Sequence, residues 1–247
     1  MSIKPESHLL TSEEISEIES LGFQFHGIAS AKEDFINTNF LNFNLLIFLK
    51  EINEIFNLVG DTANKLIYLE KSTMPEIRIQ YFTDDYEDEI NGLAFSRIFI
   101  RQNDELVVKH DFFRLPASSR GKGMAKQVFR VSLQQYLNMG VNKILVHAAL
   151  NDGGYAWARN YFTATNRSEI NQILENAKIK LSKIQFHAVE RIYLNYYSKK
   201  PAGSAFPIVK WAELPFMKDV LRGSSWHGVI DLKNQEQFTN FMSYVFN

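Results

Sequence analysis

The spacing of apolar residues changes near Pro75, and this change most limits the folds open to the chain. Residues 45–56 carry apolar side chains every three or four positions, which is the period of an α-helix. Residues 77–81 alternate apolar and polar side chains, as a half-buried strand does. Segments 93–101 and 106–115 are of strand type, and the polar turn between them predicts an antiparallel hairpin. The chain is therefore expected to be mixed α/β (α+β), with a largely antiparallel sheet flanked by helices.

The first part of the chain is predicted to be helical. Residues 1–72 are expected to form a helical N-terminal extension that packs on the core. Gly60 would end one helix, and Asp61 would cap a short further helix that runs through Tyr68.

Residues 73–247 are predicted to form the main domain, interrupted by a helical insertion at about 163–225. Apolar side chains over 170–184 follow a helical rule, and a second helix is expected over 187–197. The apolar stripe of the insertion could extend the core, form the face of a homodimer, or cover an acceptor site. The remaining expected elements are helices over 124–138 and 153–162, strands over 143–149 and 226–232, and a terminal helix capped by Asn234.

Composition excludes several classes of protein. The 247 residues include 27 basic and 28 acidic side chains, so the chain is not a globally basic nucleic-acid-binding protein. It has no cysteine, which excludes disulfides, thiolate metal sites and catalysis by a protein thiol. The six histidines show no paired metal-ligand spacing, so we predict no catalytic metal. Without a signal-peptide core or a membrane-length apolar run, we expect a cytoplasmic protein with no membrane partner.

The stretch from Phe112 to Asn151 is the most informative part of the sequence. It contains no Asp or Glu, and a glycine-containing turn, residues 118–123, separates a strand from a helix. Backbone N–H groups at the start of a helix carry partial positive charge and suit a phosphate. Six basic side chains lie in this stretch: Arg114, Arg120, Lys122, Lys126, Arg130 and Lys143. Taken alone, this pattern is also that of a surface turn with solvated cations.

The run Arg-x-x-Gly-x-Ala, here Arg120, Gly123 and Ala125, resembles the acyl-CoA-binding motif of the GNAT superfamily of N-acetyltransferases. The resemblance covers about 50 residues in the order strand, turn, helix, strand, helix. Asn151 matches an Asn of the family's closing segment, whereas Trp157 stands where the family has a Tyr. Pro116 lies four residues before Arg120 rather than three, which implies a slightly longer loop.

The resemblance implies acyl transfer from acetyl-CoA, or another acyl-CoA, to a small-molecule or peptide amine by direct attack. The pantetheine arm would lie along 112–115 and 146–149, and a backbone N–H near Phe113–Leu115 would polarise the thioester carbonyl. The implied cofactor-binding residues are Phe113, Arg114, Leu115, Arg120, Gly121, Lys122, Gly123, Met124, Ala125, Asn151 and Trp157.

Candidate catalytic residues flank this region. His110 and Asp111 could each serve as the general base, but they alternate along a strand, so only one can face the active site. Tyr155 could protonate the departing thiolate in place of the missing family Tyr. Side chains of these types at such positions are more often structural than catalytic.

Two further functions are weighed against the enzyme. The absence of the family Tyr at Trp157 favours a non-catalytic CoA-binding or regulatory module. Transfer from an aminoacyl-tRNA is disfavoured by the neutral overall charge and the lack of a second basic tract, so no nucleic-acid partner is expected. The acidic run 84–89 could attract a cationic amine, but such runs are more often solvated loops.

Overall fold

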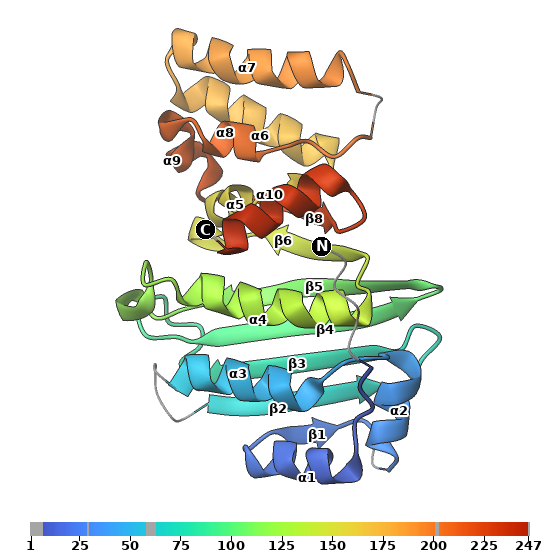
Figure 1. Cartoon of the computed structure of the whole chain (residues 1–247). Coiled ribbons are helices and arrows are strands. Elements are labelled where there is room, and N and C mark those ends of the chain that lie inside the picture. Colours follow the sequence, from blue (N-terminus) through green and yellow to red (C-terminus); the bar gives the residue numbers. More distant parts are fainter. Residues whose placement is uncertain (1–6, 29, 58–62, 201–202, 247) are drawn as a thin grey trace. The chain divides into compact units, whose positions relative to one another are not determined.

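The structure is a computed structural model that describes residues 7–28, 30–57, 63–200 and 203–246, with only the backbone at 150 and 151. Ten α-helices and eight strands lie in this part of the chain (Figure 1). The chain divides into two compact units, the first running through Asn142 and the second spanning Lys143–Val245. The units do not follow the expected boundary near residue 72.

The first unit is built on five strands paired in chain order. They are β1 (Gln24–His26), β2 (Ala63–Glu70), β3 (Glu76–Thr83), β4 (Ala94–Gln102) and β5 (Glu105–Arg114). All neighbouring pairs are antiparallel except β1 and β2, which are parallel. β4 and β5 form the expected hairpin around a two-residue turn, where Asn103 adopts a φ of 53° that Asn tolerates better than most residues.

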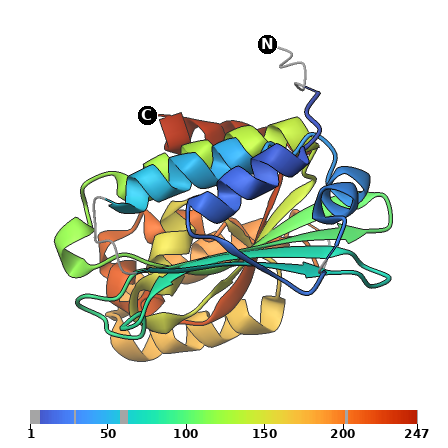
Figure 2. The same cartoon turned by 90° about the horizontal axis from the view of Figure 1, so that it is seen from below.

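Helices cover one face of this sheet. They are α1 (Ser12–Ser20), α2 (Lys32–Asn39), α3 (Leu45–Asn57) and α4 (Met124–Met139), with the short 3-10 helix η1 at Ala117–Ser119. Figure 2 shows α1, α3 and α4 on the same side of the strands. The ring of Phe48 on α3 packs on those of Phe43, Phe95 and Phe99 at centroid distances of 5.7, 6.4 and 6.3 Å. Aromatic packing between α3 and β4 therefore forms the centre of this core.

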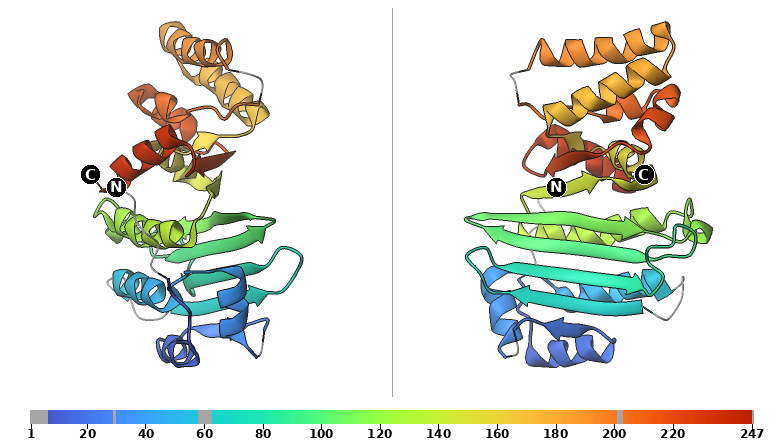
Figure 3. Two further views of the ribbon diagram at one scale, coloured as in Figure 1. Left: turned by 45° about the vertical axis from the view of Figure 1, so that its right-hand side comes forward. Right: turned by 180° about the vertical axis from the view of Figure 1, so that it is seen from behind.

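The second unit has three antiparallel strands in the order β6, β8, β7. Their bounds are β6 (Lys143–Ala148), β7 (Thr163–Ala164) and β8 (Trp226–Asp231). The helices are α5 (Leu150–Arg159), α6 (Arg167–Lys180), α7 (Lys183–Tyr197), α8 (Val209–Ala212), η2 (Pro215–Met217), α9 (Lys218–Leu221) and α10 (Gln235–Phe246). Figure 3 shows α6 and α7 packed against each other.

Neighbouring residues of β8 face opposite sides. The buried Trp226 donates its indole N–H to the Gly154 carbonyl on α5 at 3.3 Å, whereas His227 meets Glu169 on α6. Gly154 also lets the end of α9 approach α5 closely, because a Cβ there would lie 2.3 Å from the Leu221 carbonyl oxygen.

The expected fold class is confirmed, and so are the hairpin and the Asn234 cap. Gly140, in the left-handed conformation, ends α4. The short helix expected through Tyr68 is wrong, because residues 63–70 form β2; Gly60 and Asp61 lie outside the described residues. The helical pattern of the insertion does not run on to Ile184, which belongs to α7 and is 85% exposed. In the described residues no helix is long and apolar enough to cross a bilayer.

Replacing Phe48 by Ala should lower the free energy of unfolding by about 3–5 kcal/mol, because Phe48 has no exposed surface and its removal opens a cavity. The matched control is its neighbour Ile47→Ala, which is 46% exposed and should cost about 1 kcal/mol or less. Urea denaturation measures both. Equal losses in the two variants would contradict this description of the core.

Candidate functional site

The predicted phosphate-binding turn lies between η1 and α4 in the first unit. Gly121 and Gly123 adopt φ values of 74° and 81°, in the left-handed region that favours glycine. A Cβ at either position would meet no atom within 4 Å. The glycines are therefore required by the backbone conformation, and the space in front of them is open.

The main chain of this turn offers a row of N–H groups. Within the described residues, the N–H groups of Gly121, Lys122, Gly123, Met124 and Ala125 donate to no protein acceptor. The first helical hydrogen bond of α4 runs from the Gln127 N–H to the Gly123 carbonyl at 3.1 Å, and no side chain caps the helix. These donors and the positive end of the helix form a cradle suited to an anion.

Two arginines near the turn are bound to the loop between β3 and β4. Arg114 Nη1 donates to the carbonyls of Tyr86 and Glu87 at 3.0 and 2.5 Å. Arg120 donates from Nε to the Leu115 carbonyl at 2.9 Å and from Nη2 to the Glu89 carbonyl at 2.5 Å.

The Ala117 N–H adds a bond of 2.7 Å to the Ile90 carbonyl. The arginines therefore fix the acidic loop through its main chain, a role that the sequence did not reveal. Lys122 is exposed and has no partner among the described residues, so its charge is available at the turn.

His110 and Asp111 lie on opposite faces of β5, beside a β-bulge. Ser96 pairs with Phe112 and Arg97 with His110, which leaves Asp111 as the extra residue. Asp111 is exposed and accepts a hydrogen bond from Ser96 Oγ at 3.0 Å. It stays a candidate general base.

His110 is wrongly placed for a general base. Its ring is 1% exposed, stacks on Phe129 at 5.8 Å, and lies with Nε2 2.8 Å from the Tyr136 hydroxyl on α4. Burial, aided by the positive charge of Arg97, holds the pKa of His110 well below its ordinary value. His110 is therefore held in the core as a neutral ring.

The three remaining predicted residues lie on α5, in the second unit. Tyr155 is half-buried, with Lys218 Nζ 5.9 Å from its ring centre. Trp157 packs edge-on against the buried Phe162 at 5.2 Å, which favours a packing role. Asn151 lies in the first turn of α5, and its side chain is outside the described residues. Their roles toward a cofactor stay predictions.

A polar cluster in the second unit has no signal in the sequence, because its members are far apart along the chain. His147 on β6 and His227 on β8 are cross-strand partners whose rings stack at 4.4 Å. Glu169 accepts from the ring and backbone N–H groups of His227 at 2.7 Å, and His147 Nε2 lies 2.9 Å from Ser225 Oγ. No group of three or more His, Cys, Asp and Glu in the described residues could hold a metal ion.

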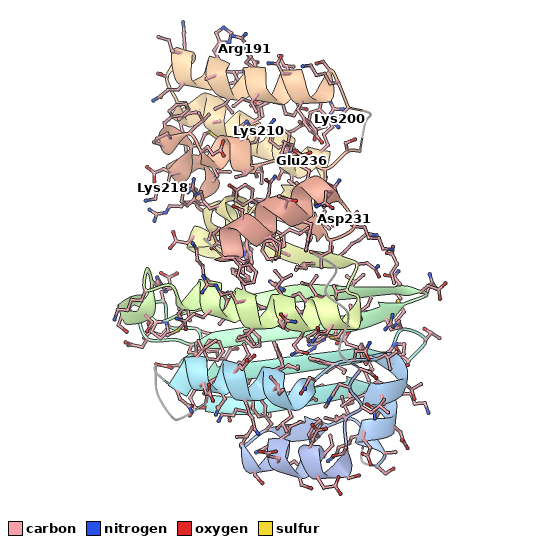
Figure 4. The ribbon with its side chains drawn as sticks, viewed as in Figure 1. Arg191, Lys200, Lys210, Lys218, Asp231 and Glu236 are labelled. Atoms are coloured by element: carbon pink, nitrogen blue, oxygen red, sulfur yellow. The ribbon has the colours of Figure 1, made fainter. Side chains whose placement is uncertain are left out.

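The inserted segment carries more basic than acidic side chains, contrary to the expectation that the chain has no second basic tract. Residues 163–225 contain ten Lys and Arg but five Asp and Glu, so the stated lack of a second basic tract is wrong. Figure 4 labels Arg191 on α7, Lys210 on α8 and Lys218 on α9, which are all exposed. These three cations lie on separate helices, unlike the consecutive main-chain N–H groups of the turn before α4.

The buried His110 predicts a pH dependence of stability. Its folded-state pKa lies below the unfolded value of about 6.5, so below that pH the unfolded chain binds more protons. Its contribution to stability is complete above about pH 6.5 and falls as the pH drops toward the folded-state pKa, by up to about 1.4 kcal/mol per pH unit.

The variant His110→Gln should lose this pH-dependent contribution to stability, while the Gln amide can still hydrogen-bond to the Tyr136 hydroxyl. Urea unfolding of both proteins at several pH values between 7.5 and 5 measures the difference. The same pH slope in the variant and the wild type would show that His110 does not titrate as its burial requires.

Comparison with known proteins gives no relative for this chain. No family model, no curated protein and no solved structure matches it. The grounds for assigning a function are therefore the geometry of the turn before α4 and the residues around it.

Proposed function

We propose that the chain binds an acyl-CoA, most simply acetyl-CoA, and transfers the acyl group to an amine. The observation that carries the proposal is the cradle, the five main-chain N–H groups from Gly121 to Ala125 that have no protein acceptor. A diphosphate supplies several anionic oxygens in a row, which matches such a row of donors. The glycines keep side chains out of the approach, and Lys122 adds a positive charge.

The order of elements around the cradle supports this choice over other anions. Strand β5, the turn, α4, β6 and α5 follow one another as the GNAT resemblance implied. Phosphate loops of the P-loop or dinucleotide-binding type are disfavoured because the glycine spacing of this turn matches neither.

The proposed chemistry is a direct attack of the amine on the thioester. The nitrogen lone pair forms a bond to the carbonyl carbon, the C–S bond breaks, and CoA leaves as its thiolate. The Phe113 N–H would stabilise the oxyanion. Asp111, which is exposed on β5, would take the proton of the attacking amine, and the thiolate would take one from water. No metal takes part, and the reaction would take place in the cytoplasm.

A non-catalytic CoA-binding or regulatory module is the second candidate. The packing of Trp157 against Phe162 favours it, because an indole cannot supply the proton that a Tyr hydroxyl could. Both candidates use the same cradle, so binding alone does not separate them.

Isothermal titration with acetyl-CoA tests the shared binding step. Lys122→Glu should weaken binding by about tenfold, because it reverses a charge beside the diphosphate. Lys71→Glu is the control: Lys71 is exposed in the same unit and has no partner among the described residues. Absence of binding by the wild type, or equal effects of the two variants, would refute the cradle as the binding site.

Turnover separates the enzyme from the module. A thiol-trapping assay with acetyl-CoA and a panel of small-molecule and peptide amines should show CoA release that depends on the amine. Asp111→Asn should reduce that release by about 100-fold without weakening acetyl-CoA binding. Tight binding with no release from any amine would favour the module.

A further inference from the structure

Arg97 on β4 is a buried cation that the proposed reaction has not yet used. Its side chain has no exposed surface, and among the described residues no carboxylate lies within ion-pair distance. Nε and Nη2 make no hydrogen bond of acceptable geometry there, although the Tyr136 hydroxyl lies close enough to raise the pKa of Arg97. Burying a charge in this way costs folding free energy, and an apolar side chain of similar size would avoid the cost. A contribution to folding stability therefore does not explain why an arginine is buried at this position.

The one guanidinium nitrogen with partners holds the β-bulge. Arg97 Nη1 donates to the Ser96 carbonyl at 2.8 Å and to the Phe112 carbonyl at 3.3 Å. These two residues pair across β4 and β5 where the register shifts. The guanidinium carbon also lies 4.4 Å from the ring centre of Phe95 and 5.6 Å from that of Phe113. Two carbonyls and two aromatic rings thus hold the guanidinium at the bulge.

The Phe112 carbonyl belongs to the same peptide group as the Phe113 N–H. In a trans peptide these two groups point in opposite directions, and no cis peptide occurs in the described residues. Because the carbonyl points toward β4 and Arg97, the Phe113 N–H points away from β4. A cation bound to the carbonyl also draws electron density from the peptide, which makes the N–H a stronger donor.

The guanidinium is charged near neutral pH. Burial lowers the pKa of Arg97 to about 10, and the Tyr136 hydroxyl and Asp111 partly oppose that shift. Tyr136 is hydrogen-bonded to His110, whose ring is neutral. Arg97 is therefore the one positive charge among these three side chains.

We infer that Arg97 is a positioning residue that aims and strengthens the Phe113 N–H as the donor to the thioester carbonyl. This inference rests on the proposed acyl-CoA function. Arg97 does not touch the acyl group, and it acts through the peptide that joins Phe112 to Phe113.

Infrared spectroscopy of bound acetyl-CoA, with and without a ¹³C label at the carbonyl, tests the inference. A hydrogen bond lowers the stretching frequency of the carbonyl, so the wild type should shift the band below that of free acetyl-CoA. Arg97→Met should move the band at least halfway back, with acetyl-CoA affinity unchanged to within about twofold because the cradle is intact. The matched control is Arg101→Met, since Arg101 also lies on β4 and donates to a main-chain carbonyl, that of Asn39 at 3.0 Å.

A merely structural role for Arg97 predicts a different result. Arg97→Met would then lower the melting temperature and leave the band of bound acetyl-CoA where the wild type has it, which would overturn the inference. Should Arg97→Met fail to fold, Arg97→Gln decides by the same criterion, because Gln can still donate to the Phe112 carbonyl but carries no charge.

A wild type that binds no acetyl-CoA would refute both the proposed function and the inference about Arg97. Normal binding with unchanged bands in the variants would sink the inference alone.

Discussion

The proposed function depends on main-chain N–H groups for which the described part of the protein supplies no acceptor. Five consecutive N–H groups at the turn before α4 have no acceptor among the described residues, and two glycines hold them in a conformation that other residues rarely adopt. Such donors are satisfied by water or by a ligand. The stretch from Phe112 to Asn151 has no acidic side chain of its own, whereas the acidic β3–β4 loop is bound to Arg114 and Arg120 beside the turn.

The arginines of this unit that lie near the turn and the bulge donate to main-chain carbonyls. Arg114 and Arg120 fix the β3–β4 loop through its carbonyls, and Arg97 binds the carbonyls at the bulge of β5. Each arginine therefore uses its charge to place main-chain groups. The proposed site is built in the same way, with main-chain N–H groups for the diphosphate and for the thioester oxygen.

Much of the fold, and the turn itself, could be predicted from local patterns. The 3.6-residue period located α3, the two-residue alternation located β3, and the polar turn located the β4–β5 hairpin, since each depends on residues close in sequence. The tertiary environment could not be predicted. His110 and Asp111 differ in burial because of a bulge, and His147 meets His227 only through strand pairing. The cap at Asp61 predicts a short helix through Tyr68, whereas pairing with β3 makes residues 63–70 a strand.

Backbone amide NMR during titration with acetyl-CoA tests the central claim most directly. If the cradle binds the diphosphate, the amide protons of Gly121 to Ala125 move downfield together as acetyl-CoA is added, and CoA without the acetyl group moves them equally. The claim is contradicted if these five signals stay in place at saturating acetyl-CoA, whether or not signals elsewhere in the protein shift.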